Sequence, residues 1–189
     1  MKKAKIYLLV CLFILVLQIN AQGQNSTPLQ NDKTSIGIGI GLDHGGVGGN
    51  VLMYPHKNIG VFAGVGYAFA GIGFNAGAKV RLASDNPTSR VIPYAIGMYG
   101  YNAAIQVTNK SDLNKFFYGP SVGVGIDLRS KNPNKNSYWS FAILYPVRSS
   151  EVDEYRDDLS YYHNVVFENE LIPVAFSINY RLIIKYFDN

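Results

Sequence analysis

The sequence predicts an all-β protein, specifically an eight-stranded antiparallel up-and-down transmembrane β-barrel. The first observation is an alternation of large apolar residues with glycine or polar residues, which begins at residues 36–42 and returns seven more times. Because successive side chains of a strand point to opposite faces, each segment has one apolar face and one face of small or polar residues. The second observation is that the apolar face carries no charge.

Eight strands follow from this alternation. They lie at residues 35–42, 47–54, 59–69, 72–83, 91–107, 116–129, 138–146 and 173–187. Clusters of Gly, Pro, Asn and Asp separate several of them, for example at residues 43–46, 55–58 and 132–134. An even number of strands lets an antiparallel sheet close, so that every backbone donor and acceptor has a partner within the wall.

The two faces of the strands separate a membrane barrel from a soluble one. One face collects uncharged side chains, among them Ile36, Ile38, Ile40, Leu42, Val51, Met53, Val61, Val65, Phe74, Val80, Val122, Val124, Ile143, Phe176, Ile178, Leu182 and Ile184. The opposite face holds mostly Gly, Ser and Asn, with a few cations. A soluble barrel needs charged side chains on its exterior. The pattern therefore favours lipid outside, and a soluble periplasmic ligand-binding barrel is the alternative.

Residues 1–21 are predicted to be a signal peptide. Lys2, Lys3 and Lys5 precede an apolar run at residues 6–17, and Ala21 offers a small residue for cleavage. The apolar run is short for a membrane span, and an uncleaved anchor is the alternative. A polar segment at residues 22–34 then precedes a barrel domain at residues 35–189.

Composition excludes several function classes. Cys11 is the only cysteine and lies in the leader, so the exported chain has no disulfide and no thiolate metal site. Three of the 17 Lys and Arg residues also lie in the leader, and the rest nearly balance the 13 Asp and Glu residues. This near-neutral charge argues against a nucleic-acid partner.

Both ends of an even-stranded barrel are expected in the periplasm, so that the longest connection, residues 147–172, faces outward. Aromatic residues near the strand ends are expected to form two girdles at the membrane surfaces. One girdle would comprise Tyr67, Phe69, Phe74, Tyr118, Tyr145 and Phe176, and the other Tyr94, Trp139, Phe141 and Tyr186.

The alternating strands, the leader ending Asn20-Ala21-Gln22 and the aromatic-rich residues 176–182 resemble a known family. These features are similar to the small eight-stranded outer-membrane barrels related to OmpA and OmpX, in particular the "outer membrane protein beta-barrel domain" proteins common in Bacteroidetes. The resemblance covers residues 35–187 and implies insertion into the bacterial outer membrane by its assembly machinery, in contact with outer-membrane lipid. One departure is the terminus, where Asp188 and Asn189 follow the aromatic pair at 186–187.

An eight-stranded barrel has room inside only for side chains, so a packed lumen is expected rather than a pore. The space beside the glycines is predicted to be filled by Leu52, Tyr54, Phe62, Tyr99, Tyr101 and Tyr138. Six charged residues are predicted to face inward, namely Lys79, Arg81, Asp127, Arg129, Arg181 and Lys185. Since a buried charge needs a partner, we expect Asp127 to pair with Arg81 or Arg181. A structural network is one interpretation of this set, and an anion-binding vestibule is the other.

Residues 147–172 hold seven of the 13 carboxylates, interleaved with tyrosines. We expect a surface loop containing a short hairpin, and we hypothesise that any extracellular partner docks there. The candidate contact residues are Glu151, Asp153, Tyr155, Tyr161, Tyr162 and His163. Calcium binding is an alternative interpretation of the carboxylates, although the spacing of an EF-hand is absent.

No catalytic residue, metal site or cofactor is assigned from the sequence. Catalysis in a small outer-membrane barrel would need a histidine with an acid and a nucleophile near the outer rim. His44, His163, Ser160 and Asp158 fall in outward loops, but no spacing fixes them into a triad. We therefore expect a monomeric, non-enzymatic outer-membrane barrel with a structural or surface-interaction role. A lipid-modifying outer-membrane enzyme is the remaining alternative.

Overall fold

The computed structural model describes residues 33–68, 70–82, 89–107, 110–130, 132, 134–167 and 171–184. The predicted leader, most of the polar segment, Phe69, Lys185 and Tyr186 lie outside the described residues. None of the described helices is both long and apolar enough to cross a membrane.

Eight antiparallel strands close into one barrel, as the alternation predicts. The strands are β1 (Thr34–Gly41), β2 (Gly46–His56), β3 (Ile59–Ala68), β4 (Gly71–Arg81), β5 (Val91–Ile105), β6 (Lys115–Arg129), β7 (Ser137–Pro146) and β8 (Ala175–Ile184). Each strand pairs with the next, and β8 closes the barrel on β1, where Thr34 faces Ile184 and Gly41 faces Ser177. The predicted strand limits differ from these by a few residues at the ends.

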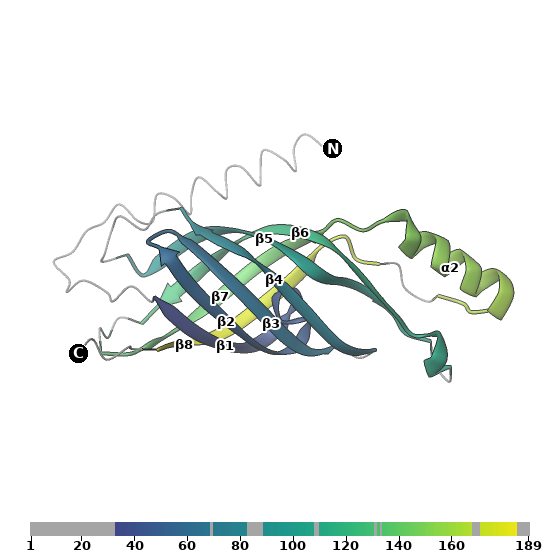
Figure 1. Cartoon of the computed structure of the whole chain (residues 1–189), viewed down its shortest axis with the longest axis horizontal. Coiled ribbons are helices and arrows are strands. Elements are labelled where there is room, and N and C mark those ends of the chain that lie inside the picture. The colour runs from purple at the N-terminus through teal and green to yellow at the C-terminus, as the bar shows by residue number, and fades with distance from the viewer. Residues whose placement is uncertain are drawn as a thin grey trace.

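β5 and β6 are the longest strands, with 15 residues each, whereas the other strands have 8 to 11. Their additional length projects beyond the barrel toward the helix α2 (Ser150–His163), which lies past the same end (Figure 1). We call this the α2 end of the barrel, and the opposite end, where β1 starts and β8 finishes, the terminal end. About 9–11 residues suffice for a tilted strand to cross a bilayer.

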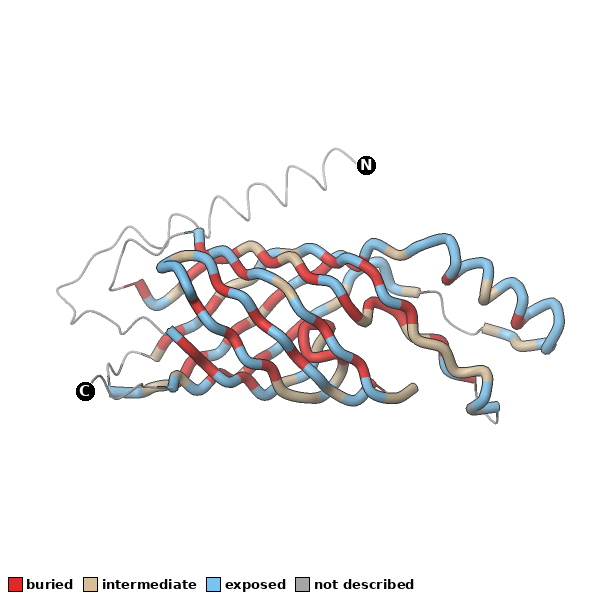
Figure 2. The backbone as a smooth tube through the Cα atoms, viewed as in Figure 1, coloured by how far each residue is buried: buried red, intermediate tan, exposed pale blue. Residues whose placement is uncertain are grey.

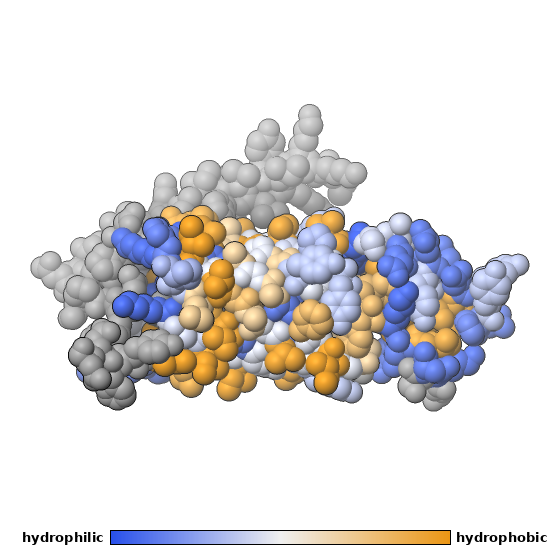
Figure 3. Space-filling model, in the orientation of Figure 1, coloured by the Kyte–Doolittle hydropathy of each residue, from blue (hydrophilic) through white to orange (hydrophobic). Residues whose placement is uncertain are grey.

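The outer face of the barrel is apolar and uncharged. Exposed and buried residues alternate along the strands, so that Ile38 on β1 and Ile72 on β4 are 66% and 69% exposed (Figure 2). Where the described strands form the barrel wall, no Asp, Glu, Lys or Arg faces outward, and the partly exposed Lys115 lies on the projecting part of β6. Apolar residues cover the side of the barrel between two hydrophilic ends (Figure 3).

Aromatic rings cluster on this outer face toward the α2 end. The exposed rings there are Tyr67, Phe74, Tyr99, Tyr118, Tyr145 and Phe176. Five of them are residues expected in the first girdle, and Phe74 and Tyr118 pack with ring centroids 5.0 Å apart. At the terminal end, exposed Trp139 packs on Tyr180 at 5.0 Å. The prediction for Tyr94 is wrong, because this ring is buried inside the barrel.

The lumen is filled by side chains from several strands. Its apolar part comprises Leu42, Leu52, Tyr54, Phe62, Tyr94, Ile96, Met98, Ala142 and Leu144. Tyr138 is also buried in the interior, as predicted, and Tyr101 is partly buried against this cluster. The prediction for Tyr99 is wrong: this ring is 62% exposed, because Ile96 and Met98 of β5 take the inward positions.

The connection between β1 and β2 folds into the barrel instead of outward. It forms a short 3-10 helix, η2 (Leu42–His44), whose three residues are all buried. Gly45 ends η2 in the left-handed conformation, and its N–H donates to the Leu42 carbonyl at 2.9 Å. The expected outward positions of His44 and of the Leu42 side chain are therefore wrong, because the chain turns inward at Gly41.

Glycines on β3 and β4 make the space that η2 occupies. A Cβ atom on Gly64 would lie 2.3 Å from the Asp43 carbonyl oxygen, and one on Gly66 would lie 2.6 Å from that of His44. A Cβ on Gly73 would lie 2.7 Å from the carbonyl oxygen of Gly45. Real Cβ atoms do not approach other atoms so closely. These glycines therefore admit backbone, whereas others, such as Gly60 beside Leu52 and Tyr54, admit side chains as expected.

Asn75 marks the place where β5 leaves the barrel wall. The β4–β5 ladder ends at the pair of Asn75 and Gly100, although β5 continues to Ile105. The Asn75 amide then donates to two carbonyls, that of Leu42 in η2 at 2.6 Å and that of Tyr101 at 2.9 Å. One side chain thus links η2 to β5 beyond the end of the β4–β5 ladder.

We predict that Gly64→Ala lowers the free energy of unfolding by about 1–3 kcal/mol, because η2 or β3 must move to admit the new methyl group. The measurement is urea unfolding in detergent micelles. Gly97→Ala is the matched control, since nothing lies within 4 Å of a Cβ at Gly97. Equal stability of the two variants would contradict the role of Gly64 as space for η2.

Candidate functional site

The first polar cluster of the lumen is centred on Asp127. Its side chain is fully buried on β6, with Lys79 Nζ 2.7 Å from Oδ1 and Arg81 Nη2 3.8 Å from Oδ2. Lys79 also donates to Ser140 Oγ at 3.3 Å and lies 3.6 Å from the centre of the Tyr94 ring. Of the two partners expected for Asp127, Arg81 is the one beside it, and Lys79 is nearer still.

The other cations predicted for this network lie elsewhere or are not described. Arg181 donates through Nη1 to Asn50 Oδ1 at 2.5 Å and through Nε to Ser35 Oγ at 3.1 Å. Arg129 is buried two residues beyond Asp127 on β6, and Lys185 lies outside the described residues. Of the six predicted residues, Lys79, Arg81 and Asp127 therefore lie together, and the side chain of Arg181 bonds to Asn50 and Ser35.

Asp43 of η2 is the centre of a second polar cluster, which the sequence analysis missed. Its Oδ1 accepts hydrogen bonds from His44 Nδ1 at 2.9 Å and from Ser177 Oγ. Its Oδ2 accepts from Asn179 Nδ2 at 2.8 Å and from Asn50 Nδ2 at 3.3 Å. Asn50 thus links the Asp43 carboxylate to the Arg181 guanidinium. One sequence signal could have predicted this cluster. Asn50, Ser177 and Asn179 all have inward parity in their strands, and three buried polar side chains need a partner.

Asp43, His44 and Ser177 have the residue types of a hydrolase triad but not its geometry. In a triad the serine bonds to the histidine, which in turn bonds to the carboxylate. Here Ser177 bonds to Asp43 directly, and His44 Nε2 is buried without a hydrogen-bond partner among the described residues. This arrangement holds η2 in place and offers no activated nucleophile.

Between the two clusters lies only a small cavity. Its volume is about 10 Å³, and its lining includes Asp43, Leu52, Phe62, Lys79, Tyr94 and Arg181. A single water molecule needs about 10–15 Å³ on this measure. This cavity is therefore too small for a solute, and Lys79 and Arg181 in its lining bond to protein groups.

Beyond the α2 end, a second hydrophobic core forms what we call the α2 head: α2, the projecting parts of β5 and β6, and the segments that follow α2. The buried residues of this core are Ala103, Ile105, Val107, Phe117, Val152 and Leu159. Leu113, Tyr155, Val165, Phe167 and Leu171 pack around them. This cluster shares no residue with the cluster in the lumen.

The predicted hairpin in the loop at residues 147–172 is wrong, because α2 occupies residues 150–163. Val152, Tyr155 and Leu159 recur at a spacing of three and four residues, which places them on one helical face. Glu151 and Asp153 lie in the first turn, where the helix dipole favours negative charge. Asn164 ends the helix in the left-handed conformation. The interleaved tyrosines concealed this period.

Polar contacts fix α2 to the β5–β6 hairpin. Lys115 on β6 forms an ion pair with Glu151 at 2.9 Å, and the Tyr155 hydroxyl donates to the Leu113 carbonyl at 2.9 Å. On the approach to α2, Asn102 donates to the Val147 carbonyl at 3.0 Å. The helix is thus held at a defined position relative to β5 and β6.

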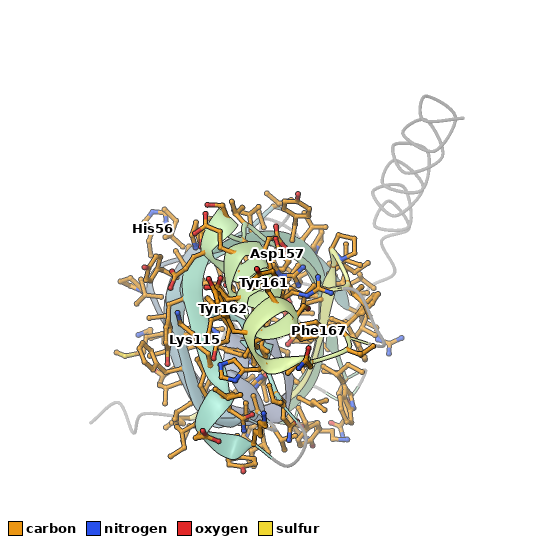
Figure 4. The ribbon with its side chains drawn as sticks, turned by 90° about the vertical axis from the view of Figure 1, so that its right-hand side faces the viewer. His56, Lys115, Asp157, Tyr161, Tyr162 and Phe167 are labelled. Carbon is orange, nitrogen blue, oxygen red and sulfur yellow. The ribbon has the colours of Figure 1, made fainter. Side chains whose placement is uncertain are left out.

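The remaining face of α2 is acidic and tyrosine-rich. Its exposed residues include Asp153, Glu154, Asp157, Asp158, Tyr161, Tyr162 and His163. Tyr161 and Tyr162 are 80% and 71% exposed, and their rings meet edge-on at 4.9 Å. In the end-on view α2 falls within the outline of the barrel, with Asp157, Tyr161 and Tyr162 labelled along it (Figure 4). Of the six predicted contact residues, Tyr155 packs against the core of the head instead. The centroid of its ring lies 5.8 Å from that of the Phe117 ring.

An open pocket lies on the side of this face. It measures about 600 Å³, and its lining includes Asp153, Arg156, Asp157, Ser160, Asn164 and Phe167. Arg156 lies 4.9 Å from the centre of the Phe167 ring, which forms part of the wall. Among the described residues, no group of three or more His, Cys, Asp or Glu residues could hold a metal ion.

Comparison with known proteins adds one structural likeness. No protein-family model matches the chain, and no curated protein matches it. Among solved structures, the chain is similar to the N-terminal β-barrel domain of Pseudomonas aeruginosa OprF, with 9% sequence identity and a TM-score of 0.45. The match covers 81% of this chain and 100% of that domain. The barrel assignment itself rests on the strand pairing described above.

We predict that Asp127→Asn lowers the free energy of unfolding by about 3–5 kcal/mol, because Lys79 and Arg81 then lose the carboxylate that compensates their buried charges. Urea unfolding in micelles measures this loss, and a second change, Lys79→Met, is expected to restore part of it. The control is Glu151→Gln in the exposed pair with Lys115, which should cost at most about 1 kcal/mol. Equal losses in Asp127→Asn and Glu151→Gln would refute the network.

Leu159→Ala tests whether α2 is held by the core of the head. We expect the local stability of α2 to fall by about 2–5 kcal/mol while the stability of the barrel stays unchanged, because Leu159 is 1% exposed and belongs to this core. Amide hydrogen exchange over residues 150–163 should accelerate relative to Ser160→Ala, which changes the neighbouring exposed residue. Unaltered exchange in Leu159→Ala would show that the core does not hold the helix.

Proposed function

We propose that the protein is a non-enzymatic integral β-barrel of the bacterial outer membrane, with a closed lumen and a structural or surface-interaction role carried by the α2 head. The uncharged, apolar outer face is the observation that carries this proposal. A charged residue facing lipid near the bilayer midplane costs about 2–4 kcal/mol, whereas the same residue facing water costs nothing. The absence of such residues from the described outer face of the barrel supports a lipid environment.

The alternatives fit the same observations less well. A soluble periplasmic barrel would expose Ile38, Ile72 and their neighbours to water over the whole side of the molecule. It would also need a cavity for its ligand, and the cavity between the two polar clusters measures only about 10 Å³. A lipid-modifying enzyme would need a nucleophile in contact with a base, and Ser177 is instead bonded to Asp43.

Orientation follows from the position of the α2 head. Long connections of outer-membrane barrels face the cell exterior and short turns face the periplasm. The connection that contains α2 is the longest, whereas β2 and β3 are joined at the terminal end by the two residues Lys57 and Asn58. We therefore orient the α2 end outward and the terminal end toward the periplasm, which is the side expected for the N-terminus if the predicted leader at residues 1–21 is cleaved.

The exposed face of α2 is the part of the protein offered to a partner. Its carboxylates favour a basic partner surface, and Tyr161 and Tyr162 offer large rings that lose little conformational entropy on binding. Because polar contacts and a separate core hold α2 in place, this face is presented in a fixed conformation.

The decisive experiment compares arginine substitutions inside and outside the proposed membrane region. Ile38→Arg is expected to reduce the free energy of unfolding in phospholipid vesicles by about 2–4 kcal/mol. Tyr161→Arg, at a still more exposed position on α2, should leave it unchanged. Urea titration of vesicle-embedded protein measures both. Should the unsubstituted chain stay folded and monomeric in detergent-free buffer, with Ile38→Arg harmless, the membrane proposal fails.

A further inference from the structure

The terminal end of the barrel carries an exposed cation at each described chain entry or connection. Lys33 immediately precedes β1, and Lys57 lies between β2 and β3. Arg90 immediately precedes β5, and Lys135 lies between β6 and β7. All four are exposed. We call these four residues the cation rim. Because they belong to different connections, they are distributed around the barrel instead of being gathered on one side.

The two ends of the protein differ in the sign of their charge. The described connections at the terminal end contain no exposed Asp or Glu. The connections at the α2 end show the reverse balance, with most of their charged residues acidic. The cation rim is therefore a property of one end and not of the whole surface.

The cation rim lies directly beside the apolar outer face of the barrel. Lys57 is two residues before exposed Ile59, and Lys135 is four residues before exposed Trp139. Trp139 packs on Tyr180, and aromatic residues of this kind favour the boundary between hydrocarbon and headgroups. Lys and Arg side chains at such a boundary extend toward the headgroups while their methylene groups stay on apolar surface. The charges thus lie at the level where phosphates would lie.

We propose that the cation rim binds the phosphodiester headgroups of anionic phospholipids in the leaflet around the terminal end. This inference rests on the proposed membrane function and adds the lipid class that one end selects. Each basic residue near a membrane surface adds to the attraction for anionic lipid. Cations separated around a circumference suit many small headgroups, each reached by one side chain, better than they suit a single macromolecular partner. The acidic α2 end would not concentrate the same lipids.

Trp139 provides the probe, because it is the only tryptophan of the chain and faces outward near the cation rim. The full chain is reconstituted in equimolar mixtures of phosphatidylglycerol and phosphatidylcholine, with brominated acyl chains on one lipid or on the other. Brominated phosphatidylglycerol is expected to quench Trp139 at least about threefold more effectively, as a measure of local enrichment. High salt should remove the preference, because screening weakens exposed charges.

A variant that combines Lys33→Gln, Lys57→Gln, Arg90→Gln and Lys135→Gln removes the cation rim. In this variant, both brominated lipids are expected to quench the fluorescence of Trp139 equally. Lys110→Gln with Arg156→Gln, which removes two cations from the α2 end, should retain the preference. If the fourfold variant fails to fold, Arg90→Gln with Lys135→Gln replaces it. Equal quenching of the unsubstituted chain by both lipids, or a preference that persists without the rim cations, overturns the inference. Absence of quenching by either lipid in folded protein would instead overturn the membrane function itself.

Discussion

Closure of the sheet is the constraint on which the rest of this structure depends. Because β8 pairs with β1, the sheet has no edge strand, and the side chains of the wall point either to the exterior or into a narrow interior. The exterior positions of the wall are free of charge in the described strands. The polar side chains that point into the lumen must therefore find partners there, and that requirement explains both buried carboxylates.

The lumen meets this requirement by dividing its contents. Asp127 neutralises cations from β4, and the aromatic faces of Tyr54 and Tyr94 lie against the same cations. Asp43 is supplied by η2, a connection and not a strand, and it satisfies the amides and hydroxyl of β2 and β8. Glycines of β3 and β4 admit this connection. The glycine alternation therefore has a second structural role besides strand formation, because it leaves room for the backbone of η2 inside the barrel.

The sequence predicted the barrel because period-two alternation survives in most strands, and it failed where that signal is ambiguous. In β5 both parities are uncharged, so that Tyr94 and Tyr99 could not be assigned to the interior or the exterior from pattern alone. The inward turn of η2 could not be predicted, because a short polar connection has the same sequence pattern whether it faces water or fills a lumen. For the candidate site, the position of the acidic loop and the partner Arg81 were predictable, whereas Asp43 and α2 depend on tertiary packing that no local pattern states.

The end of the β4–β5 ladder at Gly100 separates the molecule into two parts. On the side of the terminal end, side chains pack in the lumen. On the side of the α2 end, β5, β6 and α2 bury a different set of residues in a core of their own. At this point the Asn75 side chain donates a hydrogen bond to the Tyr101 carbonyl, just beyond the last β4–β5 pair. The two cores can thus be altered one at a time, because neither supplies residues to the other.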